Sequence, residues 1–103
     1  MIYIKLHKTD GGVILAMCDE SLIKSVLDDG DVFIDVKSYS EFYMGDLVDG
    51  SKAKEMIDVG SLLSVNAIGA ESVQVAMAVS AITKENVKDV KGVPYAQAYK
   101  VDY

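Results

Sequence analysis

The chain has 103 residues, of which 50% are apolar and 25% charged, and its net charge is −6. This profile is typical of one globular domain, which we expect to span residues 1–103. No apolar run approaches the ~18 residues of a membrane span. The first residues lack the long apolar core of a secretory signal, so we expect a cytoplasmic protein. One cysteine and one histidine exclude an internal disulfide and a Cys/His zinc site within the chain, and no metal or cofactor is expected.

The negative charge is concentrated in the middle of the chain. Residues 19–58 carry eleven acids against four lysines, a balance of −7, whereas residues 1–18 carry +1 and residues 59–103 are balanced at four against four. Arginine is absent. Because arginine is the usual residue for bidentate contacts with phosphate and guanine, its absence argues against direct nucleic-acid readout. A weak RNA contact through lysines, or docking on another protein, stays open.

The first eighteen residues predict a β-hairpin. Residues 2–8 alternate between apolar and polar side chains, which is the period of a half-buried strand. Thr9-Asp10-Gly11-Gly12 predicts a tight turn, because Asp-Gly tolerates the positive φ that such turns require. Residues 13–18 are apolar on both faces and predict an interior strand.

The middle of the chain predicts two helices on either side of a strand and a loop. Asp19 is placed to cap a helix with apolar residues at helical spacing, and Gly30 is placed to end it. Residues 32–36 predict a third strand. Residues 37–50 have no clear period and predict a loop, and a short helix is expected over residues 51–58.

The last third of the chain predicts strand, helix and strands again. We expect a strand over 62–68, a helix over 70–81 and strands over 87–90 and 95–101. Residues 13–36 share this plan, and such helices connect parallel strands by right-handed crossovers. The expected class is therefore α+β (or α/β). It is a single two-layer domain with a mixed β-sheet, an N-terminal hairpin and about three helices in strand–helix–strand units.

Two features that suggest ligand chemistry are better explained by local structure. The strand-to-helix turns at residues 18–20 and 68–71 are not glycine-rich, and each carries a carboxylate that caps a helix and repels phosphate. Asp28-Asp29-Gly30-Asp31 lacks the spaced oxygen ligands of an EF-hand loop. That run predicts a helix end followed by a solvated turn.

Cys18 is expected to be a small buried apolar residue. A helix start can activate a thiol, but the adjacent Asp19 and Glu20 oppose a thiolate. His7 is the available base if the first two strands pair, yet no third orienting group is apparent.

The loop of residues 37–50 is a candidate binding surface. It holds Tyr39, Phe42 and Tyr43 beside Gly45 and Asp46. Exposed aromatic side chains anchor a partner or stack on a base, whereas buried ones close the core beneath the loop. We expect Phe42 in the core. For Tyr39 and Tyr43, an exposed position and a buried one both stay open.

A second candidate surface follows the proline. Asn66 lies in an apolar strand, where it either satisfies a backbone group or points into a cleft. Pro94 cannot donate a ladder hydrogen bond, so Gly92-Val93-Pro94 marks a turn, a bulge or a sheet edge. Tyr95 and Gln97, two residues apart, share one strand face, which is either a recognition edge or a half-exposed strand.

The order and spacing of several motifs resemble a known family. They are the opening strand, Cys18-Asp19-Glu20, Phe42-Tyr43-x-Gly45, Asn66-Ala67-Ile68-Gly69 and Gly92-Val93-Pro94-Tyr95-Ala96-Gln97. Over nearly its whole length the chain resembles an archaeal family of uncharacterised proteins, domain-of-unknown-function family 424. It departs from the family at Tyr95, where we expect histidine in relatives. If that histidine performs chemistry this chain has lost it, and if it binds, tyrosine still offers a ring and a hydrogen bond. The resemblance implies an archaeal, cytoplasmic setting and a loose association with translation or RNA.

Three functions follow as expectations. The leading one is a non-enzymatic binding or adaptor domain of an intracellular assembly, whose partner is a protein or a ribonucleoprotein. The alternatives are a small enzyme with a polar site, and a structural homo-oligomer joined through a sheet edge. The candidate binding residues are Tyr39, Tyr43, Gly45, Asp46, Asn66, Tyr95 and Gln97, of which Asp46, Asn66, Tyr95 and Gln97 form the enzyme alternative. An RNA surface requires one face to collect the lysines at positions 5, 8, 84, 88, 91 and 100.

Overall fold

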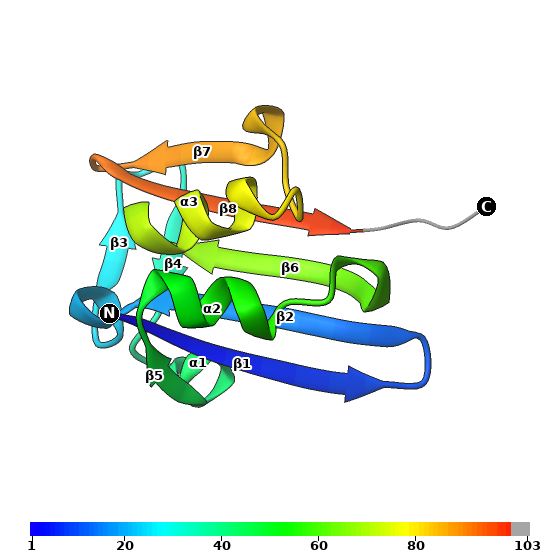
Figure 1. The fold of residues 1–103 in the computed structure, drawn as a ribbon. Helices are drawn as coiled ribbons and strands as arrows, with labels where there is room; N and C mark the ends of the chain where they lie inside the picture. The colour runs from blue at the N-terminus through cyan, green and yellow to red at the C-terminus, as the bar shows by residue number, and fades with distance from the viewer. Residues whose placement is uncertain (100–103) are drawn as a thin grey trace.

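A six-stranded mixed sheet forms the frame of the protein (Figure 1). The computed structural model describes residues 1–99. The strands of this sheet lie in the order β5-β1-β2-β6-β8-β7. Their bounds in chain order are β1 Ile2–Thr9, β2 Gly12–Asp19, β5 Asp46–Val48, β6 Leu62–Ile68, β7 Val87–Val90 and β8 Val93–Tyr99. A separate two-stranded sheet pairs β3 (Val26–Asp28) with β4 (Phe33–Asp35).

The predicted N-terminal hairpin is confirmed. β1 and β2 pair antiparallel along their whole length, from Ile2 opposite Asp19 to Thr9 opposite Gly12. Thr9 and the two glycines close the turn, and the Thr9 hydroxyl donates to the Gly12 carbonyl at 2.7 Å. β2 then lies in the interior of the sheet, which explains why both of its faces are apolar.

The α+β class is confirmed, and one of the two predicted strand–helix–strand units is formed. β6 runs parallel to β2. It leads through α3 (Ala70–Ala78) to β7. β8 pairs antiparallel with both β6 and β7, so β7 is parallel to β6 with β8 between them.

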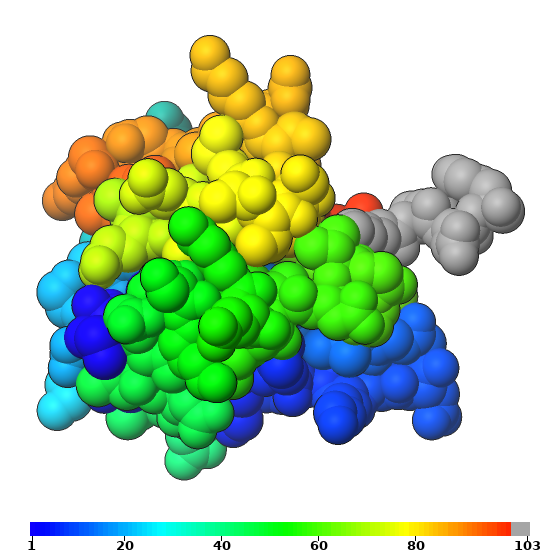
Figure 2. All heavy atoms as spheres, viewed as in Figure 1, coloured from blue at the N-terminus to red at the C-terminus, as the bar shows by residue number. Residues whose placement is uncertain are grey.

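Two helices cover one face of the sheet. α2 (Gly50–Met56) and α3 lie side by side over it (Figure 1), and in the space-filling view they cover most of the central surface (Figure 2). Beneath them the alternate residues of β1 and β2 form the centre of the main hydrophobic core: Ile2, Ile4, Leu15 and Met17. This is the helical layer of a two-layer domain.

The opposite face of the sheet is covered only in part. The β3–β4 hairpin and α1 (Ser40–Tyr43) pack over one end of it. A second core forms there around Cys18, Val36 and Tyr43, each buried. The rest of this face, which we call the open face, carries the polar residues of the candidate site.

The predicted helix over residues 19–30 is wrong. A single 3₁₀ turn, Glu20–Leu22, is followed by β3 and the hairpin. Acidic side chains close this hairpin, because Asp28 Oδ1 accepts from the Gly30 amide at 2.9 Å and Asp29 Oδ1 from the Val32 amide at 2.8 Å. Short side chains that bond nearby amides favour turns over helices, so they outweigh the helical spacing of the apolar residues. The strand–helix–strand unit predicted for residues 13–36 is therefore also wrong.

The predicted loop over residues 37–50 contains α1 and β5, which pairs with the edge of β1. These elements are one turn and three residues long, too short for a periodic signal. The helix expected over 51–58 is confirmed as α2, and that over 70–81 ends at Ala78, with Ser80 at a φ of 61° beyond it. β8 is confirmed through Tyr99, and the last two residues of the predicted strand lie outside the described residues.

Candidate functional site

The centre of the open face holds a pair of amide side chains. Asn66 of β6 and Gln97 of β8 are directly opposite strand partners. The Gln97 Nε2 donates to the Asn66 Oδ1 at 3.1 Å. Asn66 therefore bonds a neighbouring side chain on the surface of the sheet, and not a backbone group in the core. Gln97 is exposed, and the pair has further donors and acceptors that can bond a ligand.

A groove of about 350 Å³ lies between this pair and the β3–β4 hairpin. Its walls come from β4, the segment that follows it and α1, and the large sheet contributes Gln97. The lining residues are Phe33, Ile34, Asp35, Val36, Tyr39, Phe42, Tyr43 and Gln97. The structure thus brings the predicted aromatic loop and the predicted β8 motif to one concave surface.

The most exposed aromatic residues surround this surface. Among the described residues, Tyr99, Tyr39 and Phe33 lead the large hydrophobic side chains in exposure, at 80%, 67% and 64%. Phe33 and Tyr39 line the groove. Tyr99 shares the open face with Gln97, since residues two apart on a strand point to the same side.

Tyr43 supports the groove from within. Its side chain is buried in the second core, and burial raises the pKa of its phenol to about 12, with a further contribution from Cys18. Phe42 packs edge-on against Tyr43 and stacks on His7 with ring centroids 4.6 Å apart. The His7 Nε2 bonds the Phe42 carbonyl at 2.8 Å. These contacts hold α1 against β1 and fix the groove wall.

A smaller hollow of about 150 Å³ adjoins the groove, lined by Asn86, Lys88, Tyr95 and Gln97. Tyr95 and Gln97 point to the same face, as their spacing predicts, and Lys88 is the direct strand partner of Tyr95. Gln97 lines both cavities. The groove and the hollow therefore meet at Gln97, and we treat them together as the candidate site.

Two predicted site residues lie elsewhere. Gly45 packs against β1, where an added Cβ would overlap the Ile4 carbonyl oxygen. Asp46 is the strand partner of Ile4 and so points to the helix side of the sheet. Two strands separate β5 from β6, which puts Asp46 roughly 14 Å from Asn66 and on the opposite face. Of the four residues of the enzyme alternative, Asp46 is therefore apart from Asn66, Tyr95 and Gln97, which share the open face.

Cys18 is buried in the second core, as expected. Burial, together with the smaller effect of the Asp19 carboxylate, raises the pKa of its thiol to about 12. His7 lies opposite Ile14 and Cys18 opposite Tyr3, so the two are about four residues, or ~13 Å, apart along the hairpin. The histidine cannot reach the thiol as a base.

The raised pKa of Cys18 predicts a pH-dependent stability. The unfolded thiol titrates near its ordinary value of 9.0 and the folded one near 12. Between these values the folded state holds the extra proton, so the free energy of unfolding falls as the pH rises, by up to about 1.4 kcal/mol per pH unit. Urea unfolding of the wild type and of Cys18→Ala at pH 8, 9 and 10 measures the difference. Parallel pH curves for the two proteins would contradict the assignment.

The N-terminus of α3 is already occupied by a side chain. Asp19, at the end of β2, accepts hydrogen bonds from the Glu71 amide at 3.1 Å and from the Ser72 amide and hydroxyl, both at 2.8 Å. The expectation that Asp19 caps the helix after it is wrong, because Asp19 instead accepts from amides 52 and 53 residues away, in the first turn of α3. An aspartate in this position takes the place that a phosphate group would need.

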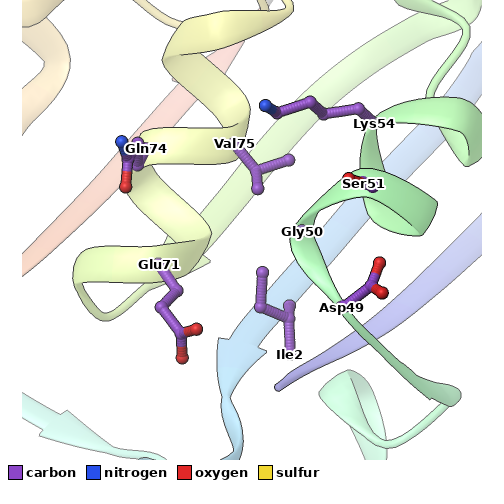
Figure 3. Close-up of a pocket in the computed structure, with 8 residues that line it drawn as sticks. All are labelled: Ile2, Asp49, Gly50, Ser51, Lys54, Glu71, Gln74 and Val75. Atoms are coloured by element: carbon purple, nitrogen blue, oxygen red, sulfur yellow. The ribbon is translucent and has the colours of Figure 1, made fainter.

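A cleft of about 370 Å³ lies between α2 and α3 (Figure 3). Asp49 and Glu71 flank Ile2 at one end, and Lys54 extends past Val75 at the other. Both acids are engaged, since Asp49 Oδ1 accepts from the Lys52 amide at 2.8 Å and Glu71 pairs with the N-terminal amine at 3.4 Å. Ile2 and Val75 are almost fully buried, so little apolar surface is left for a ligand.

The strand lysines at positions 5, 8 and 88 do not form one basic patch. Lys5 and Lys88 both point to the open face, but four strand spacings, roughly 19 Å, separate β1 from β7. Lys8 points to the other side of β1, and Lys100 lies outside the described residues.

Within residues 1–99 no group of three or more metal-ligating side chains is close enough to hold an ion. None of the helices in that range has the length and hydropathy of a membrane span.

Sequence reasoning missed Phe33 and Asp35 as site residues. Both occupy alternate positions of the predicted strand 32–36, between the apolar Val32, Ile34 and Val36. The alternation itself places Phe33 on the polar face with Asp35, which is the signal of an exposed aromatic. Lys88 was not predicted because only the pairing of β7 with β8 brings it beside Tyr95, and the same pairing carries the turn before β7, with Asn86, to the hollow.

The fold and the site define a small α+β domain with an aromatic groove on one side of a mixed sheet. A family model described as "Protein of unknown function (DUF424)" matches residues 7–101. The chain belongs to this family, and the resemblance seen in its motifs is confirmed.

A solved structure shares this fold. The chain is similar to an uncharacterised conserved protein from Methanopyrus kandleri, an archaeon, with a TM-score of 0.79 and 24% sequence identity. The similarity covers 95% of this chain and 90% of the other. No curated protein matches the sequence.

Proposed function

We propose that the protein is a binding domain that docks a protein partner on the open face, with the groove as the centre of the contact. The observation that carries the proposal is the exposure of Phe33 and Tyr39 at the groove, at 64% and 67%. Exposed aromatic rings beside a concave surface are typical of binding hot spots, because their burial by a partner removes a large apolar area from water.

The amide pair gives this surface its polar element. Asn66 and Gln97 bond each other and have further donors and acceptors that can bond a partner. Interfaces combine an apolar centre with about one hydrogen bond per 100–200 Å². In the proposed contact the rings of Phe33 and Tyr39 supply the apolar area, and the amides bond the partner's backbone.

The geometry supports the alternatives less well. The enzyme alternative needs Asp46 beside Asn66, and the two point to opposite faces. The RNA alternative needs a basic face, which the strand lysines at positions 5, 8 and 88 do not make. A homo-oligomer through the outer strands is disfavoured, because β5 and β7 have three and four residues and carry charges. A buried free thiol suits a reducing compartment, so we place this function in the cytoplasm.

Affinity capture with matched variants tests the proposal. The tagged full chain is used on an extract of its native cells, bound proteins are identified by mass spectrometry, and the affinity of a purified partner is then measured by calorimetry. Phe33→Ala and Tyr39→Ala are each expected to weaken binding roughly 30-fold, because truncating a hot-spot ring costs at least ~2 kcal/mol.

Met77→Ala is the control, since Met77 is an exposed apolar residue of α3 on the helix side. It is expected to keep the wild-type affinity. Equal affinity for Phe33→Ala, Tyr39→Ala and wild type would remove the groove from the interface. Recovery of RNA alone, still bound by both groove variants, would favour the RNA alternative.

A further inference from the structure

The outer face of the β3–β4 hairpin places two carboxylates beside an exposed ring. Asp28 is the direct strand partner of Phe33, and Val26 is the partner of Asp35. Directly opposite residues share a face, so these four side chains point outward together. The remaining pair, Leu27 and Ile34, packs into the second core. Phe33 therefore has two acidic neighbours, Asp28 directly across the ladder and Asp35 two residues along its own strand.

The same segment carries a strong excess of negative charge. Residues 28–43 contain five acids, at positions 28, 29, 31, 35 and 41, and one lysine, Lys37, which gives −4. Hydrogen bonds from the Ser38 side chain and amide to the Asp35 carboxylate lower the pKa of that group, with the Ser38 amide at 2.9 Å. Asp35 is therefore ionised in neutral solution. Phe33 and Asp35 are both part of the groove wall.

We propose that Phe33 and Asp35, in the wall of the groove, and the adjacent Asp28 together bind an arginine side chain presented by the protein partner. Its guanidinium lies on the Phe33 ring and donates to the Asp28 and Asp35 carboxylates. This inference rests on the proposed function, because it names the chemistry that the partner brings to that docking surface. An aromatic face flanked by carboxylates matches a cation that is planar, weakly hydrated and forked, and guanidinium fits this description better than ammonium.

A second copy of this chain is a poor occupant. It contains no arginine, and its docking would bring two surfaces of charge −4 together. A nucleic acid is repelled by the same charge. Charge complementarity therefore selects a basic protein segment.

Three capped five-residue peptides test the inference by NMR titration of the full chain: Gly-Leu-Arg-Leu-Gly, its lysine counterpart and its citrulline counterpart. Citrulline keeps the shape of arginine and removes the charge. The arginine peptide is expected to shift the backbone amides of residues 33–39 and 97 at about millimolar concentration, the affinity of one anchored side chain. The citrulline peptide is expected to bind at least about tenfold more weakly, with lysine between the two.

The double variant Asp28→Asn, Asp35→Asn is expected to abolish the preference for arginine over citrulline. Each asparagine keeps an oxygen that can accept the turn bond from Gly30 or Ser38, so the hairpin is preserved. The melting temperature and the NMR spectrum of the double variant, compared with those of the wild type, check that the hairpin is preserved. The matched control is Asp10→Asn, Glu55→Gln, which removes two exposed acids outside the groove and is expected to keep the preference.

Equal binding of the arginine and citrulline peptides would overturn the inference, as would shifts confined to residues outside the groove or none at about 5 mM peptide. These results leave the proposed function standing if Phe33→Ala and Tyr39→Ala still weaken the captured partner. If Phe33→Ala and Tyr39→Ala bind the captured partner as tightly as the wild type, both the proposed function and this inference are overturned. The two failures are therefore distinguishable.

Discussion

Replacing Asp19 by alanine is expected to lower the free energy of unfolding by about 3 kcal/mol, because a buried carboxylate with three partners is lost. The side chain is 7% exposed and accepts from two amides of the first turn of α3 and from the Ser72 hydroxyl. Its removal leaves donors without partners where α3 meets the sheet. Urea unfolding at pH 7 with circular dichroism measures the change.

Asp49→Ala provides the comparison for this variant. Asp49 also caps a helix, but it is exposed and accepts one bond, from the Lys52 amide at 2.8 Å. Its loss is expected to cost about 1 kcal/mol. Asp19→Asn retains an accepting oxygen without the charge and is expected to fall between the two. If Asp19→Ala costs no more than Asp49→Ala, the buried carboxylate does not hold α3 in place.

Replacing Gly69 by alanine is expected to cost at least about 3 kcal/mol, through backbone strain and steric overlap together. Gly69 has a φ of 106°, a backbone conformation that residues with a Cβ rarely adopt. A Cβ added there would overlap the carboxyl group of Asp19. The Gly69 amide also donates to the Pro94 carbonyl at 2.8 Å, so the backbone cannot shift without breaking this bond. The same urea unfolding measurement applies.

Gly92→Ala separates the two contributions. Gly92 has a φ of 80°, but an added Cβ would meet no atom within 4 Å. Its substitution is expected to cost about 1–2 kcal/mol from conformation alone. The double variant Asp19→Ala, Gly69→Ala should be destabilised by less than the sum of the two single variants. The reason is that Asp19→Ala removes the carboxyl group that the Cβ of residue 69 would overlap. Additive costs would show that the overlap with Asp19 is not the cause.

The contacts of Asp19 and Gly69 give a structural role to motifs whose role the sequence did not reveal. Asp19, Gly69 and Pro94 belong to three separate motifs of the family resemblance. In the structure they meet at one end of the sheet, where the carboxylate caps α3 and the glycine gives it room. Their contribution is to the fold. From the same motifs, Asn66 and Gln97 are left for the open face.

Local patterns predicted the elements whose causes are local. The hairpin follows from alternation in residues 2–8 and from the Asp-Gly turn, and both act over a few residues. The helix expected over 19–30 failed because β3 and β4 satisfy each other's backbone and Leu27 is buried against the sheet. That choice depends on a tertiary contact, which helical spacing does not report.

The candidate site was predicted in part for the same reason. Alternation put Tyr95 and Gln97 on one face, and the structure places both beside one hollow. Tyr43 is buried, and Asp46 faces the helix side, because β5 pairs with β1 in a register that no local signal announces.

The class of fold, the N-terminal hairpin and the strand faces could be predicted from sequence patterns, because period-two alternation and turn chemistry act between near neighbours. The family could be predicted from its motifs. Which faces meet, by contrast, depends on long-range packing. Packing brings Asp19 to the start of α3, where it accepts from the amide of Glu71, 52 residues away in sequence. It also places residues 33–43 and Gln97 of β8 around one groove. Those contacts depend on strand order and on burial of whole surfaces, which are properties of the packed chain and not of any short segment.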